Sequence, residues 1–279
     1  MHHRITWDEL PEAARAAIAD RTGPIRAART ASGGRNSPVA AVLDTADGVV
    51  FVKGIPVDQR DAATQAREAA MAPHVTKVAP ALLWHLPDAA GWNVLGFEYV
   101  EGRHADYAPG SPDLAAVVEL LERVGGIDCP DDAPARDARR AFASYVDDPE
   151  AAGLLGGTAL LHTDYNPENV LIGPDSGARL VDWAWPCRGA AWIDPCVLIV
   201  RLIAAGHTPQ AAEACVADVP AWQAAPAVGV GVFAAASVRL WAEIADQDPQ
   251  PWKRDMAEAA RVWAQIRHAA FGRCRGDAS

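Results

Sequence analysis

The chain has 279 residues, of which 50% are hydrophobic and 22% are charged, a composition typical of globular proteins and not of disordered ones. The 36 acidic and 25 basic side chains give a formal net charge of −11. Such a surface repels phosphate backbones, and no polybasic segment is present, so we expect neither nucleic acid nor a membrane as partner. The five cysteines form no Cys-x-x-Cys pair, which favours a reducing compartment over a disulfide scaffold. We therefore expect a cytoplasmic protein, monomeric or homodimeric.

The first hundred residues are rich in predicted strands. Thr6 and Glu9 form a capping-box pattern, which predicts a helix that ends at Gly23. A polar loop with two glycines, residues 32–37, follows the first predicted strand. Apolar runs between turn signals predict strands, and an alanine-rich stretch predicts a helix. The predicted strands are 25–31, 39–43, 49–52, 82–86 and 92–98, and this helix is 58–71.

After about residue 100 the pattern changes to helices. Two short strands are expected within 156–181. One helix is predicted to begin at Ser111-Pro112, and the other predicted helices are 136–146, 194–206, 209–217, 220–246 and 250–270. Residues 221–238 carry no charge, but proline, glutamine and glycines interrupt them, so we interpret them as a buried helix. The chain is thus predicted to be α+β, with a small antiparallel-sheet lobe over residues 1–100 and a larger, mostly helical lobe over residues 101–279.

The strongest chemical signal is the pattern His162-x-Asp164-x-x-x-x-Asn169, followed thirteen residues later by Asp182 at the end of an apolar strand. Phosphoryl transfer to a hydroxyl needs a carboxylate that orients the hydroxyl and accepts its proton, and Asp164 suits that role. Mg²⁺ prefers oxygen ligands and takes one or two protein carboxylates beside the phosphates. Asn169 and Asp182 are candidates for those ligands.

This pattern resembles the aminoglycoside phosphotransferase family of small-molecule kinases, which has a bilobal protein-kinase-like fold. The resemblance extends over most of the chain, and it implies a nucleotide-binding first lobe and a catalytic, substrate-binding second lobe. It also implies ATP, with GTP as an alternative donor, and Mg²⁺ as cofactors. His162 and Asp194 would support the catalytic loop.

The resemblance assigns the nucleotide site to the first lobe. Lys53, one of three lysines, interrupts an apolar strand, and it is similar to the lysine that pairs with the ATP phosphates. Glu68 is similar to the helix glutamate that holds this lysine, and Glu98 and Val100 belong to a stretch similar to the hinge that meets adenine. The loop over the phosphates would contain Ser32, Gly33, Gly34, Asn36 and Ser37.

The chain departs from protein kinases at two points. Its phosphate loop lacks the spaced Gly-x-Gly-x-x-Gly pattern, and Asp182 is followed by Trp-Ala-Trp-Pro where protein kinases have Phe-Gly. No activation-loop motif is evident, which argues against a regulated protein kinase. Trp183, Trp185 and Trp192 are interpreted as core or cleft wall, with substrate stacking as the alternative.

Simpler interpretations of these residues remain open. Asp164 and Asn169 can be turn residues, and Asp182 can cap a hairpin end. Lys53 can extend to solvent from an edge strand, and Glu68 can be a solvated helix residue. Asp194 before a proline is also typical of a helix N-cap. A zinc site at His162 and Asp164 lacks a suitably spaced third ligand.

The leading hypothesis is a Mg²⁺- and ATP-dependent kinase of a small-molecule hydroxyl. Residues 103–279 hold 15 bases and 24 acids, which favours a cationic acceptor such as an aminoglycoside. Acid clusters at 128–132 and 147–150 are weak support, because acid runs are usually solvated surface. The alternatives are another hydroxylated acceptor, such as a choline-like amine, a macrolide or a sugar, and a non-catalytic nucleotide-binding protein. A role in antibiotic resistance is not implied by the fold.

Overall fold

The computed structural model describes residues 4–31 and 37–276, with side chains described up to residue 269. The chain divides into two compact units, of which the first comprises 1–104 with 168–185 and the second 105–167 with 186–279. Each unit is therefore built from two separate stretches of sequence. The division into lobes at residue 100 stays a prediction, and these units differ from it in assigning 168–185 to the first.

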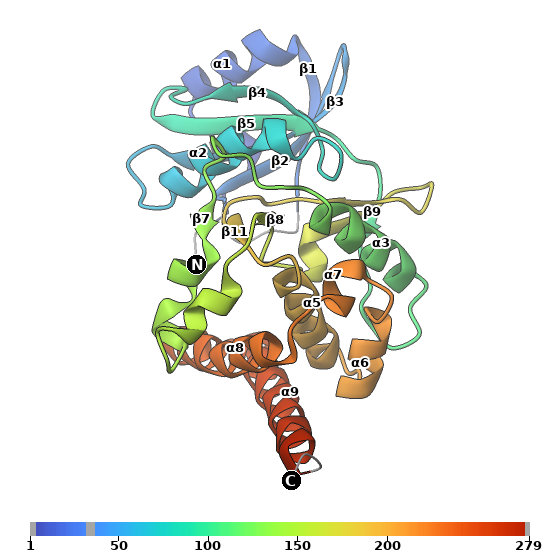
Figure 1. Cartoon of the computed structure of the whole chain (residues 1–279). Helices are drawn as coiled ribbons and strands as arrows, with labels where there is room; N and C mark the ends of the chain where they lie inside the picture. Colours follow the sequence, from blue (N-terminus) through green and yellow to red (C-terminus); the bar gives the residue numbers. More distant parts are fainter. Residues whose placement is uncertain (1–3, 32–36, 277–279) are drawn as a thin grey trace. The chain divides into compact units, whose positions relative to one another are not determined.

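The first unit contains an antiparallel sheet in the order β1-β2-β3-β5-β4 (Figure 1). Alternating and continuous apolar runs produce these strands, as expected for a sheet with a buried face. The helices are α1 (Glu12–Thr22) and α2 (Ala62–Met71). The strands are β1 (Ile25–Thr30), β2 (Val39–Thr45), β3 (Gly48–Pro56), β4 (Leu82–Leu86) and β5 (Trp92–Glu98).

The core of the first unit lies between this sheet and α1. Ala14 and Ile18 of α1 pack with Leu43 of β2 and Val52 of β3, and all four side chains are buried. The predicted single helix from Thr6 is wrong in one respect. The capping box of Thr6 and Glu9 begins only a 3₁₀ turn, Trp7–Glu9, and α1 starts after Pro11, whose ring fixes the backbone and removes a donor.

A second sheet of the first unit carries the residues around Asp182. Its order is β10-β9-β6, with β6 (Arg103–His104), β9 (Val170–Ile172) and β10 (Ala178–Leu180). Antiparallel pairing of β9 with β10 forms a hairpin. A 3₁₀ turn, Pro167–Asn169, leads directly into β9, and a similar turn, Ala72–His74, extends α2.

The second unit is mostly helical. Its longer helices are α3 (Asp113–Gly125), α5 (Ile193–Ala204), α6 (Pro209–Cys215), α8 (Ala227–Gln247) and α9 (Pro251–Gly276), and α7 (Pro220–Gln223) is a single turn. A small sheet in the order β7-β11-β8 joins β7 (Arg136–Asp137), β11 (Cys187–Gly189) and β8 (Ala159–Leu161). Its shorter turns are α4 (Ala138–Ala141), Ala143–Tyr145 and Ala151–Leu155.

The helix predicted over 136–146 is wrong, because its residues form three different elements. Arg136 and Asp137 pair with β11 in parallel, so the chain is extended there. The Asp137 carboxylate then accepts the backbone N–H of Arg139 at 2.8 Å and caps the short helix α4. A 3₁₀ turn replaces the last part of the predicted helix.

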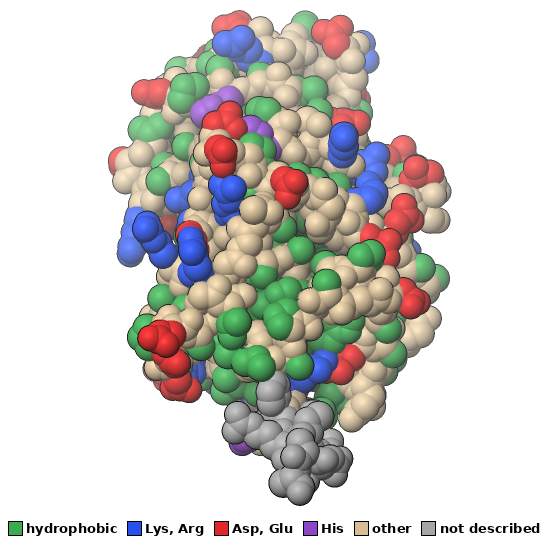
Figure 2. All heavy atoms as spheres, viewed as in Figure 1, with side chains coloured by type: hydrophobic (Ala, Val, Ile, Leu, Met, Phe, Trp, Pro, Cys, Tyr) green, Lys and Arg blue, Asp and Glu red, His purple; other side chains and the backbone are tan. Residues whose placement is uncertain are grey.

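Helix α8 is buried on one face only, which corrects the expectation of a buried helix. Phe233 and Ala236 are buried, whereas Val228 is 55% exposed. Apolar side chains are accordingly visible at the surface in Figure 2. By length and composition alone α8 could cross a membrane, with 33% of its apolar window buried, but core helices of soluble proteins pass the same test.

Gly102 permits the closest backbone approach beside β6. A Cβ added there would lie 2.2 Å from the carbonyl oxygen of Ile172 in β9. We predict that Gly102→Ala lowers the free energy of unfolding by about 1–3 kcal/mol, because the added methyl group forces the two segments apart. Urea unfolding measures this change. Gly153→Ala is the control, since its added Cβ meets no described atom within 4 Å. Equal stability of the two variants would contradict the prediction.

Candidate active site

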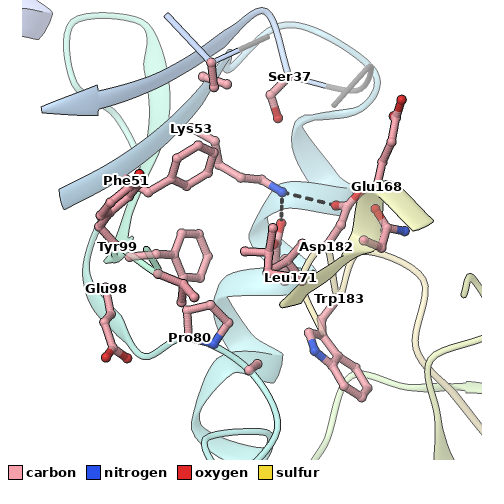
Figure 3. Close-up of a pocket in the computed structure, with 18 of the residues that line it drawn as sticks. Ser37, Phe51, Lys53, Pro80, Glu98, Tyr99, Glu168, Leu171, Asp182 and Trp183 are labelled. Carbon is pink, nitrogen blue, oxygen red and sulfur yellow. Dashed lines mark hydrogen bonds and ion pairs between the residues drawn. The ribbon is translucent and has the colours of Figure 1, made fainter. Parts of the chain in front are cut away.

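A cavity of about 260 Å³ lies within the first unit (Figure 3). Its apolar walls come from β2, β3, β5, residues 72–80 after α2 and the β9–β10 hairpin, and several polar side chains gather at one end. Its lining includes Arg4, Ser37, Phe51, Lys53, Glu68, Glu98, Tyr99, Val100, Glu168, Asn169, Asp182 and Trp183. The cavity thus unites most of the residues that the sequence assigns to nucleotide and metal binding.

Lys53 holds the polar end of the cavity together. Its Nζ lies 2.5 Å from Glu68 Oε2 and 3.1 Å from Asp182 Oδ1, the contacts drawn dashed in Figure 3. The side chains of Lys53 and Glu68 are 12% and 5% exposed. Burial disfavours the charged amine, but the two carboxylates outweigh this and raise the pKa of Lys53. Neither the exposed lysine nor the solvated glutamate of the simpler interpretations is observed.

Burial also acts on Glu68. It raises the pKa of Glu68 to about 7, and the charge of Lys53 opposes that rise. Gln65, one helical turn earlier, is buried and donates to the backbone oxygen of Asn93 in β5 at 2.7 Å. The position of Glu68 is therefore set by a helix fastened to the sheet that carries Lys53.

Asp182 follows β10 in a left-handed backbone conformation, with φ of 65°. For a residue other than glycine this conformation costs on the order of 1–3 kcal/mol and is typical of functional sites. The N–H of Val181 donates to the backbone oxygen of Asn169 at 2.8 Å, so the two metal-ligand candidates lie on adjoining strand ends. Trp183 is buried and lines the cavity, and its indole N–H donates to the Leu180 oxygen at 3.0 Å.

The segment after Asp182 is fastened to α2. Arg67 donates to the backbone oxygen of Ala184 at 3.0 Å, and its guanidinium lies 5.6 Å from the ring centre of Trp185. Trp185 is 42% exposed, whereas Trp192 is buried in the second unit against Phe233. The interpretation as core or cleft wall thus fits Trp183 and Trp192. Trp185, in contrast, lies at the surface, where its ring contacts the guanidinium of Arg67.

The hinge and phosphate-loop candidates are placed unequally. Glu98, Tyr99 and Val100 line the cavity. Glu98 is the last residue of β5, and Tyr99 and Val100 follow directly after the strand. Ser37 also lines the cavity. Ser32, Gly33, Gly34 and Asn36 lie outside the described residues.

Two charged residues of this cavity were missed by the sequence analysis. Arg4 lines it and donates to the Ala31 oxygen at 2.5 Å, and burial lowers its pKa while Glu168 opposes that change. Glu168 lies within the motif but was given no role. Arg4 precedes every predicted element, so no local pattern could have indicated it.

Asp164 belongs to the second unit, in the loop after β8. The N–H groups of His162 and Thr163 each donate to Asp194 at 2.9 Å, one to each carboxylate oxygen. Asp164 N–H donates to His162 Nδ1 at 3.2 Å, and Thr163 has a positive φ of 67°. Asp194 thus braces the loop, and it is not the N-cap, because α5 is preceded by Trp192 at that position.

Two charged residues beside this loop, Asp194 and Arg201, are buried. Burial raises the pKa of Asp194 to about 7, and the hydrogen bonds from His162 and Thr163 oppose that rise. Asp164 Oδ1 accepts from Arg201 Nη2 at 2.6 Å, an ion pair that the sequence analysis missed. The Asp164 side chain is 39% exposed, so it remains accessible.

The fold is similar to that of solved small-molecule kinases and phosphotransferases, and the predicted α+β class is confirmed. Choline kinase LicA from Streptococcus pneumoniae is 13% identical, with a TM-score of 0.62 over 90% of this chain and 99% of that one. An aminoglycoside phosphotransferase from Alicyclobacillus acidocaldarius subsp. acidocaldarius DSM 446 is 14% identical, with a TM-score of 0.63 over 96% and 97%. Spectinomycin phosphotransferase, solved with ADP and spectinomycin, is 11% identical, with a TM-score of 0.58 over 92% and 95%.

No model of a protein family matches the chain, and no curated protein matches it. The resemblance seen in the sequence is therefore supported at the level of the fold.

Asp194 offers a test of how the catalytic loop is held. We predict that Asp194→Ala costs about 1–3 kcal/mol of unfolding free energy, because two buried N–H groups lose their acceptor. Hydrogen exchange at the amides of His162 and Thr163 should accelerate. Asp218→Ala, at an exposed position of the same unit, is the control. Unchanged protection of both amides in Asp194→Ala would rule out the bracing role.

Proposed function

We propose that the protein transfers the γ-phosphate of ATP to a hydroxyl group of a small molecule, with Mg²⁺ as cofactor. One observation carries the proposal: a buried amine, Lys53, is held between Glu68 and Asp182 at the polar end of an apolar cavity. A fixed cation beside an apolar slot suits a ligand with a flat base and a polyanionic tail. The fold, shared with a phosphotransferase solved with ADP, supports this choice.

The cavity residues that the sequence singled out have defined tasks in this proposal. Lys53 neutralises phosphate charge, and Glu68 holds its amine in place. The backbone at Glu98 and Val100 would meet the base, and Ser37, with Ser32 to Asn36 before it, would cover the phosphates. GTP is an alternative donor, because no residue of the cavity is assigned to the choice between the two bases.

The donor set at the end of the cavity fits Mg²⁺. Asp182 offers a carboxylate and Asn169 an amide oxygen, and both line the same cavity. Mg²⁺ characteristically takes few protein ligands and completes its shell with phosphates and water. Within the described part of the chain, no group of three or more His, Cys, Asp or Glu could hold a metal ion. Bound at Asp182 and Asn169, Mg²⁺ would neutralise charge on the phosphates.

Asp164 is the proposed base. The acceptor hydroxyl gives its proton to the Asp164 carboxylate as its oxygen bonds to the γ-phosphorus. The bond from that phosphorus to the bridging oxygen breaks, and its electron pair leaves on the nucleoside diphosphate. His162 and Asp194 keep the loop in shape for this step.

The acceptor is proposed to be a cationic, aminoglycoside-like molecule, with a choline-like amine, a macrolide or a sugar as alternatives. The structure weakens the argument that surface acidity favours a cationic acceptor. Asp131 pairs with Arg188 at 2.7 Å, and Asp147 pairs with Arg239, so two members of the acid clusters are already neutralised. Figure 2 likewise shows acidic and basic side chains interspersed. A cytoplasmic location suits an ATP-dependent enzyme, and the cysteines that the structure describes form no disulfide.

Asp164→Asn separates catalysis from nucleotide binding. We predict that it lowers kcat by about 10²–10⁴-fold, because the base is lost, and leaves the Kd for ATP within about twofold. The assay uses Mg²⁺ and γ-labelled ATP or GTP against aminoglycosides, other hydroxylated antibiotics, choline-like amines and sugars. Asp218→Asn is the matched control. Full turnover of Asp164→Asn would exclude Asp164 as base, and nucleotide binding without transfer to any acceptor would favour a non-catalytic protein.

Asp182→Asn tests the metal site. We predict that it raises the Mg²⁺ concentration needed for half-maximal activity at least about tenfold, because a charged ligand is lost. Titration of the transfer rate with Mg²⁺ measures this, and a chelator should abolish transfer by wild type. Asp175→Asn, in the turn of the same hairpin, is the control, since its side chain only accepts from Gly177 N–H. An unchanged Mg²⁺ requirement in Asp182→Asn would place the metal elsewhere.

A further inference from the structure

Arg201 of α5 is a buried cation that no part of the nucleotide site explains. Its side chain is 8% exposed, and its Nη2 lies 2.6 Å from Asp164 Oδ1. A guanidinium withdrawn from water needs a carboxylate partner, because an unpaired buried charge is costly. The partner here is the proposed catalytic base.

Two tryptophans fix the guanidinium in place. Its central carbon lies 5.1 Å from the ring centre of Trp241 in α8 and 5.8 Å from that of Trp252 in α9. The two rings meet edge to face, with centres 6.1 Å apart. Arginine stacks on aromatic faces and presents its donors in a rigid plane, so this setting determines the direction in which Arg201 donates.

We propose that Arg201 is a positioning residue for Asp164: the Trp241–Trp252 pair fixes its guanidinium, and the guanidinium fixes the carboxylate that receives the acceptor proton. The inference rests on the proposed phosphotransfer function. A general base is effective only within hydrogen-bond reach of the proton it accepts. Asp164 follows Thr163 in a loop and is partly exposed, and the contact with Arg201 restrains its side chain.

The chain contains a matched control for this arrangement. Arg267 of α9 pairs with Glu213 at 2.7 Å, and its guanidinium lies 4.9 Å and 5.9 Å from the ring centres of Trp222 and Trp263. It is thus also an arginine between two tryptophans and bound to a carboxylate. Its partner carries no proposed chemical role, so Arg267 shows what this motif contributes to stability alone.

The first experiment compares Arg201→Met with Arg267→Met. We expect Arg201→Met to lower kcat about 10–100-fold, since small misplacement of a reacting group has effects of that size, and to leave the KM for ATP within about twofold. Arg267→Met should lower Tm by a comparable amount and keep kcat within about twofold. Arg201→Lys, which keeps the charge, should recover part of the lost kcat. Equal kcat in the two Met variants would overturn the proposal, as would no recovery in a folded Arg201→Lys.

The second experiment needs no activity. Tm is measured for Arg201→Met, Asp164→Asn and the double variant, and coupled residues should give a combined shift smaller than the sum of the single shifts. Additive shifts would show that Arg201 does not hold Asp164. If wild type transfers no phosphate, the proposed function fails, whereas this cycle still decides whether Arg201 fixes Asp164.

Discussion

Burying the ammonium group of Lys53 is the constraint on which the first unit depends. A lysine inside an apolar strand is tolerated only with carboxylates close by, and here they come from α2 and from the end of β10. Three segments that are distant in sequence must therefore converge on one atom. The left-handed backbone of Asp182 is part of this arrangement, because its carboxylate reaches Lys53 from that conformation. The cavity beside Lys53 lies where β3, α2 and the end of β10 meet.

The second unit contains a buried cation of the opposite character. The amine of Lys53 is a compact charge on a flexible stem with two carboxylate partners. Arg201 has one carboxylate partner and two aromatic neighbours, and its planar group cannot turn without leaving them. This difference agrees with the two proposed roles. Lys53 would bind a phosphate group reversibly, whereas Arg201 would hold the side chain of Asp164 in one place.

The parts of the fold and site that were predictable are those with a local signal. Strands 82–86 and 92–98 were confirmed residue for residue, because apolar alternation between turns is a local property. Lys53 was conspicuous as a charge within an apolar run. Arg201 interrupts an apolar helix in the same way. Its role, however, depends on contacts with Asp164, 37 residues away, and with two tryptophans from other helices. Contacts of that kind are set by packing and leave no spacing pattern.

The segment after Asp182 is held by hydrogen bonds to β10 and α2. Where protein kinases have Phe-Gly after this aspartate, the chain has Trp183 and Ala184, and the indole of Trp183 is buried and donates to the Leu180 oxygen. Arg67 of α2 donates to the backbone oxygen of Ala184. Glu68 is the next residue of the same helix. Glu68 and Asp182 are thus fastened to each other by the backbone as well as by Lys53. A movement of Asp182 away from Lys53 would therefore have to break both connections.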